Sequence, residues 1–358
     1  MSSLRFSTGG PRRTRTGRPQ FRAGDPPARL RPVRRGVRAA LVGLAVAALA
    51  AVPAAPAAAA PPPHVTGISE IAPQILTVDV YSPSMDRVIS NTVLRPPGGG
   101  PAPVLYLLGG VRGGTDGVSW LNDSNYEQFF ADKNVTVVTP TGGPFSEYTD
   151  WQFDDPALGP AQGNQWQTYL TRELPPAIDS AFATTGRNAV AGLSMSAGPA
   201  IDLAIQAPGL YQAAGAYSGC PINGGLFGTA QVSSVVLAGG GSASNMWGLP
   251  GGPGWAAHDP FARAGELRGT AVYLGSASGI PGEVDRLQPQ QLFGAATGGG
   301  SVEAIADACT AAFSHRLDEV GVPHTFVHRD RGAHTWGLFE AELRESWFTT
   351  IGPALGAA

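Results

Sequence analysis

Lysine is nearly absent from this chain of 358 residues: Lys133 is the only one, against 23 arginines. Acids are scarce at the start, where Asp25 is the only one in the first 60 residues. Eleven of the 24 basic residues precede Ala39, so residues 61–358 keep 13 basic and 26 acidic side chains, a net charge of −13. Phosphate contacts require clustered lysine and arginine, and this acidic body therefore argues against a nucleic-acid partner.

Long hydrophobic runs are also missing, apart from one near the N-terminus. The apolar run at residues 39–52 follows an arginine-rich segment and precedes the small residues of 55–60. That order is typical of an export signal rather than a membrane anchor. We therefore predict a leader over residues 1–60, cleavage between Ala57 and Ala60, and a mature protein that is secreted or held in the cell envelope. The pair Arg34-Arg35 leaves a twin-arginine route open beside ordinary secretion.

Cysteine is limited to Cys220 and Cys309, both in the exported part of the chain. In an oxidising compartment a disulfide between them is favoured over two free thiols, and it would contribute about 4 to 5 kcal/mol in the chain-entropy model. His324 and His328 have no third ligand beside them, and no zinc-type spacing occurs. We expect no metal and no cofactor.

The hydrophobic pattern predicts one α/β catalytic domain over residues 61–358. Residues 75–81 and 88–94 alternate like antiparallel strands, and later apolar runs fit strands buried on both faces of a parallel sheet, at 104–108, 135–138, 189–191 and 271–274. Helical patterns lie between the runs, at 166–182, 197–207, 303–320 and 336–348. Glycine-rich pieces at 224–228, 239–254 and 294–300 are expected to be surface loops. The result is a mostly parallel sheet with helices on both faces and an antiparallel N-terminal edge.

The most informative motif is Gly192-Leu193-Ser194-Met195-Ser196, which follows an apolar run and precedes an alanine-rich helical stretch. This is the strand–turn–helix context of a nucleophile elbow, in which the residue two before the serine and the residue two after it must be small, as Gly192 and Ser196 are. Gly-x-Ser-x-small alone is a weak pattern in a chain this rich in small residues. With its context, it nominates Ser194 as a nucleophile.

A serine nucleophile needs a histidine base and an acid, expected in the chain order serine, acid, histidine. His334 lies in a loop between a predicted last strand and the final helix, which is where an α/β-hydrolase fold places its base. The acid is expected after the preceding strand, in a loop that offers Glu283 and Asp285. The backbone N–H groups of Met195 and Val111 are the expected oxyanion hole, one following the serine and the other following the strand at 104–108.

Six motifs in order make the chain resemble the mycolyltransferases of the antigen 85 type, from about Val65 to the end. They are Leu107-Leu108-Gly109-Gly110-Val111-Arg112, Thr139-Pro140-Thr141-Gly142-Gly143, Tyr148-Thr149-Asp150-Trp151, Gly192-Leu193-Ser194-Met195, Asn245-Met246-Trp247-Gly248 and Gly332-Ala333-His334-Thr335-Trp336. The resemblance implies an α/β-hydrolase fold and acyl transfer from trehalose monomycolate, through an acyl-serine, to a second trehalose monomycolate or to cell-wall arabinogalactan. It also implies peripheral contact with the mycolate envelope; no protein partner is expected.

The resemblance also implies roles for individual residues. Ser194 matches the family nucleophile and His334 its base, and Glu283 in Gly279-Ile280-Pro281-Gly282-Glu283 matches the acid in preference to Asp285. Val111 and Met195 match the oxyanion-hole residues, Arg112 a sugar-binding arginine and Trp336 a tryptophan beside the base. Gly109 departs from the pattern, because many members carry there an aspartate that helps to bind trehalose.

Two other functions compete with the transferase. A secreted carboxylesterase would use the same three residues and differ only in releasing the acyl group to water. A non-catalytic surface-binding protein is the second rival, and the intact set of Ser194, Glu283 and His334 argues against it.

Overall fold

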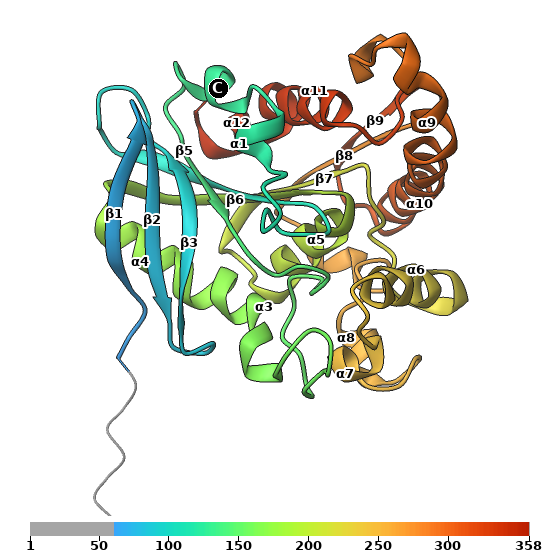
Figure 1. The fold of residues 1–358 in the computed structure, drawn as a ribbon, viewed down its shortest axis with the longest axis horizontal. Coiled ribbons are helices and arrows are strands. Elements are labelled where there is room, and N and C mark those ends of the chain that lie inside the picture. The colour runs from blue at the N-terminus through green and yellow to red at the C-terminus, as the bar shows by residue number, and fades with distance from the viewer. Residues whose placement is uncertain (1–60, 358) are drawn as a thin grey trace, which may run out of the picture. The chain divides into compact units, whose positions relative to one another are not determined.

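A nine-stranded sheet organises residues 61–357, the part of the chain that the computed structural model describes (Figure 1). The predicted export signal and its cleavage site lie outside the described residues. The strand order is β1-β2-β3-β5-β4-β6-β7-β8-β9. The strands are β1 (His64–Ala72), β2 (Ile75–Ser82), β3 (Arg87–Leu94), β4 (Ala102–Leu108), β5 (Thr136–Pro140), β6 (Thr184–Leu193), β7 (Tyr211–Tyr217), β8 (Ala271–Ala277) and β9 (His324–Arg329).

Strand direction divides the sheet in two. β1, β2 and β3 pair antiparallel, as does β3 with β5, whereas every pair from β5 through β4 to β9 is parallel. The burial patterns explain the division: β2 alternates between buried and half-buried positions, and β4 and β5 are buried at every position. The predicted fold, a mostly parallel α/β-hydrolase sheet with an antiparallel N-terminal edge, is confirmed.

Helices cover both faces of the sheet (Figure 1). They are α1 (Trp120–Asp123), α2 (Tyr126–Phe130), α3 (Trp166–Thr168), α4 (Leu174–Ala181), α5 (Ala197–Gln206), α6 (Gly225–Ala238), α7 (Ala243–Trp247), α8 (Pro253–Ala257), α9 (Leu292–Thr297), α10 (Gly299–Val320), α11 (Trp336–Ser346) and α12 (Gly352–Leu355). Short 3₁₀ turns include η3 (Ser194–Ser196) and η5 (Glu283–Asp285). π-helical turns join α3 to α4 at Tyr169–Glu173, and α11 to α12 at Trp347–Ile351.

The core is split by the sheet into two layers. Along β4, Tyr106 and Leu108 face one layer, which also holds Phe313 of α10, while Leu105 and Leu107 face the other. The second layer is filled from α11 and the π-turn after it, as well as from α1 and α2. Alternate side chains of one strand thus bury on opposite faces, as the unbroken apolar runs predicted.

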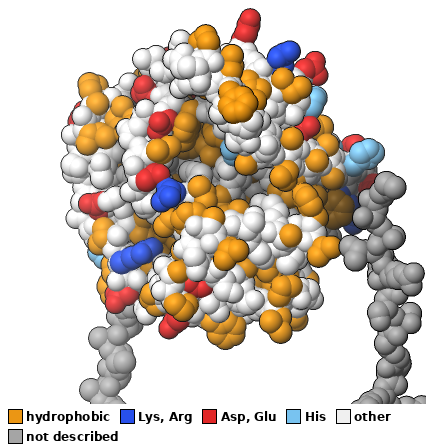
Figure 2. Space-filling model, turned by 45° about the vertical axis from the view of Figure 1, so that its right-hand side comes forward, with side chains coloured by type: hydrophobic (Ala, Val, Ile, Leu, Met, Phe, Trp, Pro, Cys, Tyr) orange, Lys and Arg blue, Asp and Glu red, His pale blue; other side chains and the backbone are white. Residues whose placement is uncertain are grey.

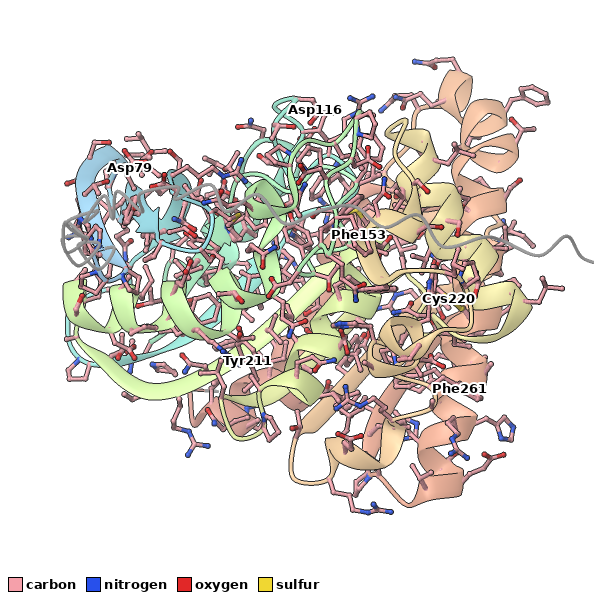
Figure 3. All side chains as sticks on the ribbon, turned by 90° about the horizontal axis from the view of Figure 1, so that it is seen from below. Asp79, Asp116, Phe153, Tyr211, Cys220 and Phe261 are labelled. Atoms are coloured by element: carbon pink, nitrogen blue, oxygen red, sulfur yellow. A yellow bond between two sulfur atoms is a disulfide. The ribbon has the colours of Figure 1, made fainter. Side chains whose placement is uncertain are left out.

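A disulfide joins Cys220, just after β7, to Cys309 on α10, with the two Cα atoms 5.1 Å apart (Figure 3). The predicted pairing is therefore confirmed. Nearby, the hydroxyl of Thr310 donates a hydrogen bond of 2.9 Å to the carbonyl of Gly219. Helix α10 is thus tied, covalently and by hydrogen bonding, to the segment that follows β7.

The three glycine-rich pieces are not simply the surface loops that we predicted, because each contains helical residues; residues 239–254 contain α7 and the start of α8. Residues 224–228 run into α6, and residues 294–300 contribute to α9 and α10. The glycines there serve close packing: a Cβ at Gly299 would overlap the carbonyl oxygen of Ala333, and one at Gly300 would overlap that of Gly279. Small residues let the N-terminus of α10 lie directly against the loop that carries His334.

Candidate active site

Ser194 stands at the turn between β6 and α5 with a positive φ of 54°. A Cβ at Gly192 would lie 2.7 Å from the carbonyl carbon of Ser196, a distance too short for any side chain. The buried hydroxyl of Ser196 donates a hydrogen bond of 3.0 Å to the carbonyl of Leu193, across the turn. The small residues on both sides of Ser194 therefore permit the reversal and hold it, as an elbow requires.

His334 lies in the loop between β9 and α11, also at a positive φ of 54°. Its Nε2 is 2.9 Å from Ser194 Oγ. Asp285 fixes the loop on both sides of the histidine, because its Oδ1 accepts from Ala333 N–H at 2.9 Å and from the Thr335 hydroxyl at 2.7 Å. The strained backbone of His334 is thus held by two hydrogen bonds to one buried carboxylate.

The acid beside His334 is Glu303, just beyond the first turn of α10. Its Oε2 is 2.8 Å from His334 Nδ1, and its side chain is completely buried. Its Oε1 accepts from Ala277 N–H at 2.8 Å and from the Ser218 hydroxyl at 2.9 Å. With Nδ1 donating to Glu303, Nε2 is left as the acceptor for the hydroxyl of Ser194.

The prediction of Glu283 as the acid is wrong. Glu283 is exposed in η5, and within residues 61–357 its carboxylate makes no hydrogen bond or ion pair. In that loop it is Asp285 whose side chain points inward, and it contacts Ala333 and Thr335 on either side of His334 rather than the imidazole ring. The loop after β8 therefore supports the loop of His334, and the acid, Glu303, comes from α10, further along the chain.

A signal for Glu303 was present in the sequence. Its helix was expected to begin at residue 303; α10 instead begins at Gly299, so Glu303 lies inside the helix. The buried residues of α10 recur at helical spacing, with Glu303 followed by Ala306, Cys309 and Phe313. An acid on the core stripe of a helix needs a partner, and that position would have marked Glu303.

Ser194 and His334 open into a pocket of about 220 Å³ that Val111, Arg112 and Trp336 also line. Val111 lies in a turn closed by the hydrogen bond from Gly113 N–H to the Gly110 carbonyl, at 2.9 Å. Within residues 61–357 the N–H of Val111 has no acceptor, so it is free to meet a ligand. Met195, whose N–H is the other predicted donor, is buried in the middle of the η3 turn.

Arg112 and Trp336 border the pocket in different ways. The exposed Arg112 guanidinium lies 3.5 Å from Asp116 and 5.6 Å from the ring centroid of Phe145. Trp336 packs edge-on against Trp120, with the ring centroids 5.3 Å apart. One exposed cation and one packed aromatic ring therefore flank the serine, which is compatible with the sugar-facing roles that the resemblance implies.

Gly109 lies beside a neighbouring cavity of about 160 Å³. A Cβ at this position would make only ordinary contacts, 3.7 Å from the backbone of Gly113. The cavity therefore has room for the side chain that Gly109 lacks.

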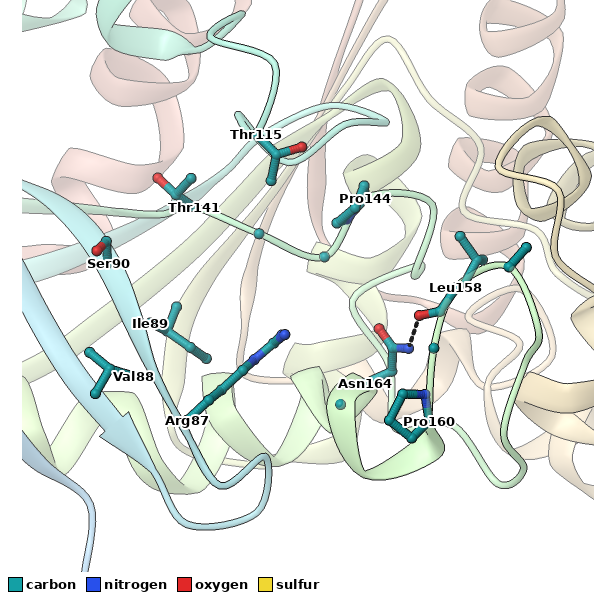
Figure 4. Close-up of a pocket in the computed structure, with 15 residues that line it drawn as sticks. Arg87, Val88, Ile89, Ser90, Thr115, Thr141, Pro144, Leu158, Pro160 and Asn164 are labelled. Atoms are coloured by element: carbon teal, nitrogen blue, oxygen red, sulfur yellow. Dashed lines mark hydrogen bonds between the residues drawn. The ribbon is translucent and has the colours of Figure 1, made fainter.

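A larger cavity, of about 600 Å³, lies elsewhere, beside Arg87, Thr141 and Asn164 (Figure 4). The Arg87 guanidinium is 5.5 Å from the centroid of a Trp166 ring, and burial lowers its pKa. Neither Ser194 nor His334 lines this cavity. We place the chemistry in the pocket of about 220 Å³, because that pocket contains a nucleophile and a base in contact and the larger cavity does not.

Within residues 61–357, no group of three or more His, Cys, Asp and Glu side chains is arranged to hold a metal ion. Over the same residues, every helix is too short or too polar to cross a membrane.

Comparison with known proteins places the chain in a family. A family model described as putative esterase matches residues 82–348. The diacylglycerol acyltransferase/mycolyltransferase Ag85A of Mycobacterium tuberculosis is 34% identical over 275 residues, covering 74% of this chain and 77% of that protein. The chain belongs to the antigen 85 family of esterase-type proteins. Ag85B of Mycobacterium leprae is 33% identical over 69% of this chain and 74% of its own length.

Solved structures agree on the fold of this antigen 85 family member. MPT51 of Mycobacterium tuberculosis has a TM-score of 0.61 and 28% identity, covering 77% of this chain and 96% of that one. The S-formylglutathione hydrolase of Agrobacterium tumefaciens has a TM-score of 0.59 over 82% of this chain and all of its own, at 15% identity. This second likeness shows the fold alone.

Proposed function

We propose that this protein is a secreted serine acyltransferase that moves mycolyl groups through an acyl-Ser194 intermediate. The observation that carries the proposal is the continuous chain of contacts from Ser194 through His334 to Glu303, which opens into a pocket. Membership of the antigen 85 family, whose curated members are named as acyltransferases, supports the transfer reaction.

The reaction begins when Ser194 Oγ attacks the donor ester and His334 Nε2 takes the hydroxyl proton. Glu303 holds the imidazole and stabilises the imidazolium that forms, while the N–H groups of Val111 and Met195 stabilise the oxyanion. The ester bond then breaks, and His334 returns the proton to the departing alcohol. An acceptor hydroxyl, deprotonated by His334, attacks the acyl-serine; the bond between the acyl carbon and Ser194 Oγ then breaks, and His334 returns the proton to Ser194.

The donor we propose is trehalose monomycolate, and the acceptor a second trehalose monomycolate or the arabinogalactan of the cell wall. Arg112 and Trp336 would contact the sugar at the pocket. Large apolar side chains are exposed on two helices, at Leu226 and Phe227 of α6 and at Leu292 and Phe293 of α9. Figure 2 shows a hollowed face on which hydrophobic side chains outnumber charged ones, which favours peripheral contact with a lipid envelope.

The alternative is a carboxylesterase that hydrolyses acyl esters. It is favoured by the family model, which describes an esterase over residues 82–348. Both reactions share the acyl-serine, and they differ only in whether water or a sugar hydroxyl arrives second. A non-catalytic binding protein has no need for the aligned Ser194 and His334.

The test incubates the purified mature protein and its Ser194→Ala variant with trehalose monomycolate and resolves the lipid products by mass spectrometry. Dimycolate formed only by the wild type supports the transferase. Free mycolic acid as the only product, with and without added arabinan, supports the esterase instead. The absence of any product from either protein would contradict both.

A further inference from the structure

A second buried carboxyl group lies behind Glu303. Glu342, on α11, is completely buried, and its Oε2 is 3.1 Å from the hydroxyl of Ser218. The same hydroxyl is 2.9 Å from Oε1 of Glu303. Ser218 follows β7 directly and holds a positive φ of 48°. One hydroxyl therefore bridges two buried carboxyl groups, one of which contacts the histidine.

The number of protons available determines which groups donate and which accept around Ser218. A serine has a single hydroxyl proton, so it can donate to only one of the two carboxyl groups. Glu303 already receives the Ala277 N–H and His334 Nδ1 as donors, which is the pattern of a carboxylate. If Glu342 keeps its proton, it donates to Ser218 Oγ and Ser218 donates to Glu303, so that every contact in the series is satisfied.

The surroundings of Glu342 favour the protonated form. The facing charges are Glu303 from α10, Arg329 from β9 and Glu345 on α11 itself, while Tyr217 and Tyr273 are the titratable groups of β7 and β8. Arg329 is paired with Glu345, so it offers Glu342 little compensation. Burial first, and then the charge of Glu303, raise the pKa of Glu342 well above its ordinary value.

Gly275 of β8 leaves room for the carboxyl group of Glu342. A Cβ on Gly275 of β8 would lie 3.0 Å from the carboxyl carbon of Glu342. The carbonyl of Gly275 in turn accepts a hydrogen bond of 2.9 Å from Ser218 N–H. Glu342 Oε1 has no partner within residues 61–357, which is less costly for a neutral acid than for an anion.

We infer that Glu342 is a positioning residue that acts as a protonated acid, orienting Glu303 through Ser218 so that its other oxygen faces His334. The inference rests on the proposed function, because the relay serves only a histidine that accepts the Ser194 proton. The consequence is an upper pH limit on the reactivity of Ser194. When Glu342 ionises, the hydroxyl of Ser218 faces two carboxylates but can donate to only one of them, and the alignment of Glu303 is lost.

The test measures the rate at which a fluorophosphonate probe labels Ser194, across pH, in the wild type and in two variants. Glu342→Gln keeps a donor toward Ser218 but cannot ionise, so we expect near wild-type labelling at neutral pH and an alkaline limit shifted up by about one pH unit or more. Glu342→Leu removes the donor, and labelling should fall about tenfold or more at every pH.

A second readout observes the proton itself. The infrared difference spectrum between the wild type and Glu342→Gln at neutral pH should contain the carbonyl band of a buried protonated carboxylic acid, whereas the contribution of buried Glu147 cancels because both proteins keep it. Identical pH profiles in these two proteins, or a spectrum without that band, would overturn the relay while leaving Ser194 reactive. Failure of the wild type to label at any pH would instead contradict the proposed function, so the two failures are distinguishable.

Discussion

Replacement of Glu303 by glutamine tests whether the acid of the site is Glu303, which the structure places beside His334, or Glu283, which the sequence suggested. The Ala277 N–H, 2.8 Å from Oε1, fixes the amide oxygen of the new side chain on that side. The amide nitrogen then faces His334 Nδ1, so the imidazole must carry its proton on Nε2. In that tautomer Nε2 no longer accepts the proton of Ser194.

The magnitude follows from the lost charge as well as the wrong tautomer. Unit charges about 4 Å apart at an effective dielectric constant of about 20 interact by about 4 kcal/mol, equivalent to about 10³-fold in rate. The tautomer error adds to this, and losses of about 10⁴-fold are typical when a triad acid becomes an amide. We therefore expect Glu303→Gln to reduce kcat for p-nitrophenyl butyrate hydrolysis by about 10³ to 10⁴-fold.

The matched control is Glu283→Gln, the same chemical change at an exposed carboxylate. Its kcat should stay within about twofold of the wild type, since the side chain contacts none of the reacting groups. Circular dichroism of both variants checks that the fold is kept. A Glu303→Gln variant that retains more than a tenth of the wild-type kcat, or a Glu283→Gln variant whose kcat falls as far as that of Glu303→Gln, would refute Glu303 as the acid.

Three further predictions concern the support of the site and the pH dependence of stability. Asp285→Ala should lower kcat about 10 to 100-fold without abolishing it, because the residues on either side of His334 lose their hydrogen bonds to Asp285; kcat equal to the wild type would contradict this. Gly192→Ala should cost about 1 to 3 kcal/mol in urea unfolding and abolish ester hydrolysis, because its Cβ would overlap Ser196, whereas Gly100→Ala, with open space around it, should change neither. Burial raises the pKa of Glu147 from 4.5 to about 8, so the stability it contributes is complete below about pH 4.5 and is lost as pH rises toward 8. Glu147→Gln removes this loss, and its stability relative to the wild type should therefore increase by about 3 kcal/mol between pH 4.5 and 7; a pH-independent difference in urea unfolding would show that Glu147 is ionised in the native state.

Local patterns predicted the parts of the site that local geometry determines. The elbow at Ser194 is specified by small residues within five positions, and the loop of His334 by the strand and helix on either side. β7 was missed because its sequence, Tyr211–Tyr217, is mostly alanine and glycine, which carry little strand signal. Its small residues are required by packing: a Cβ on Gly215 would lie 3.1 Å from that of Ala191 on β6.

The acid could not be found by the same means, because its position depends on tertiary packing. Glu303 reaches His334 only because Gly299 and Gly300 let α10 pack against the histidine loop and against Gly279. The rule that places an acid after the penultimate strand led instead to the loop of Glu283 and Asp285, where the resemblance favoured Glu283; Asp285 does serve the histidine, through the histidine's loop. The helical stripe that contains Glu303 was the usable signal.

The most direct test of the account is a single-turnover experiment on the acyl-enzyme. The mature protein is mixed with trehalose monomycolate, quenched, and digested for peptide mapping by mass spectrometry; trehalose is then added to a second sample. We expect a mycolyl adduct on Ser194 that disappears when trehalose is added, as acylated trehalose appears. An adduct on another residue, or turnover without any adduct on Ser194, would contradict it.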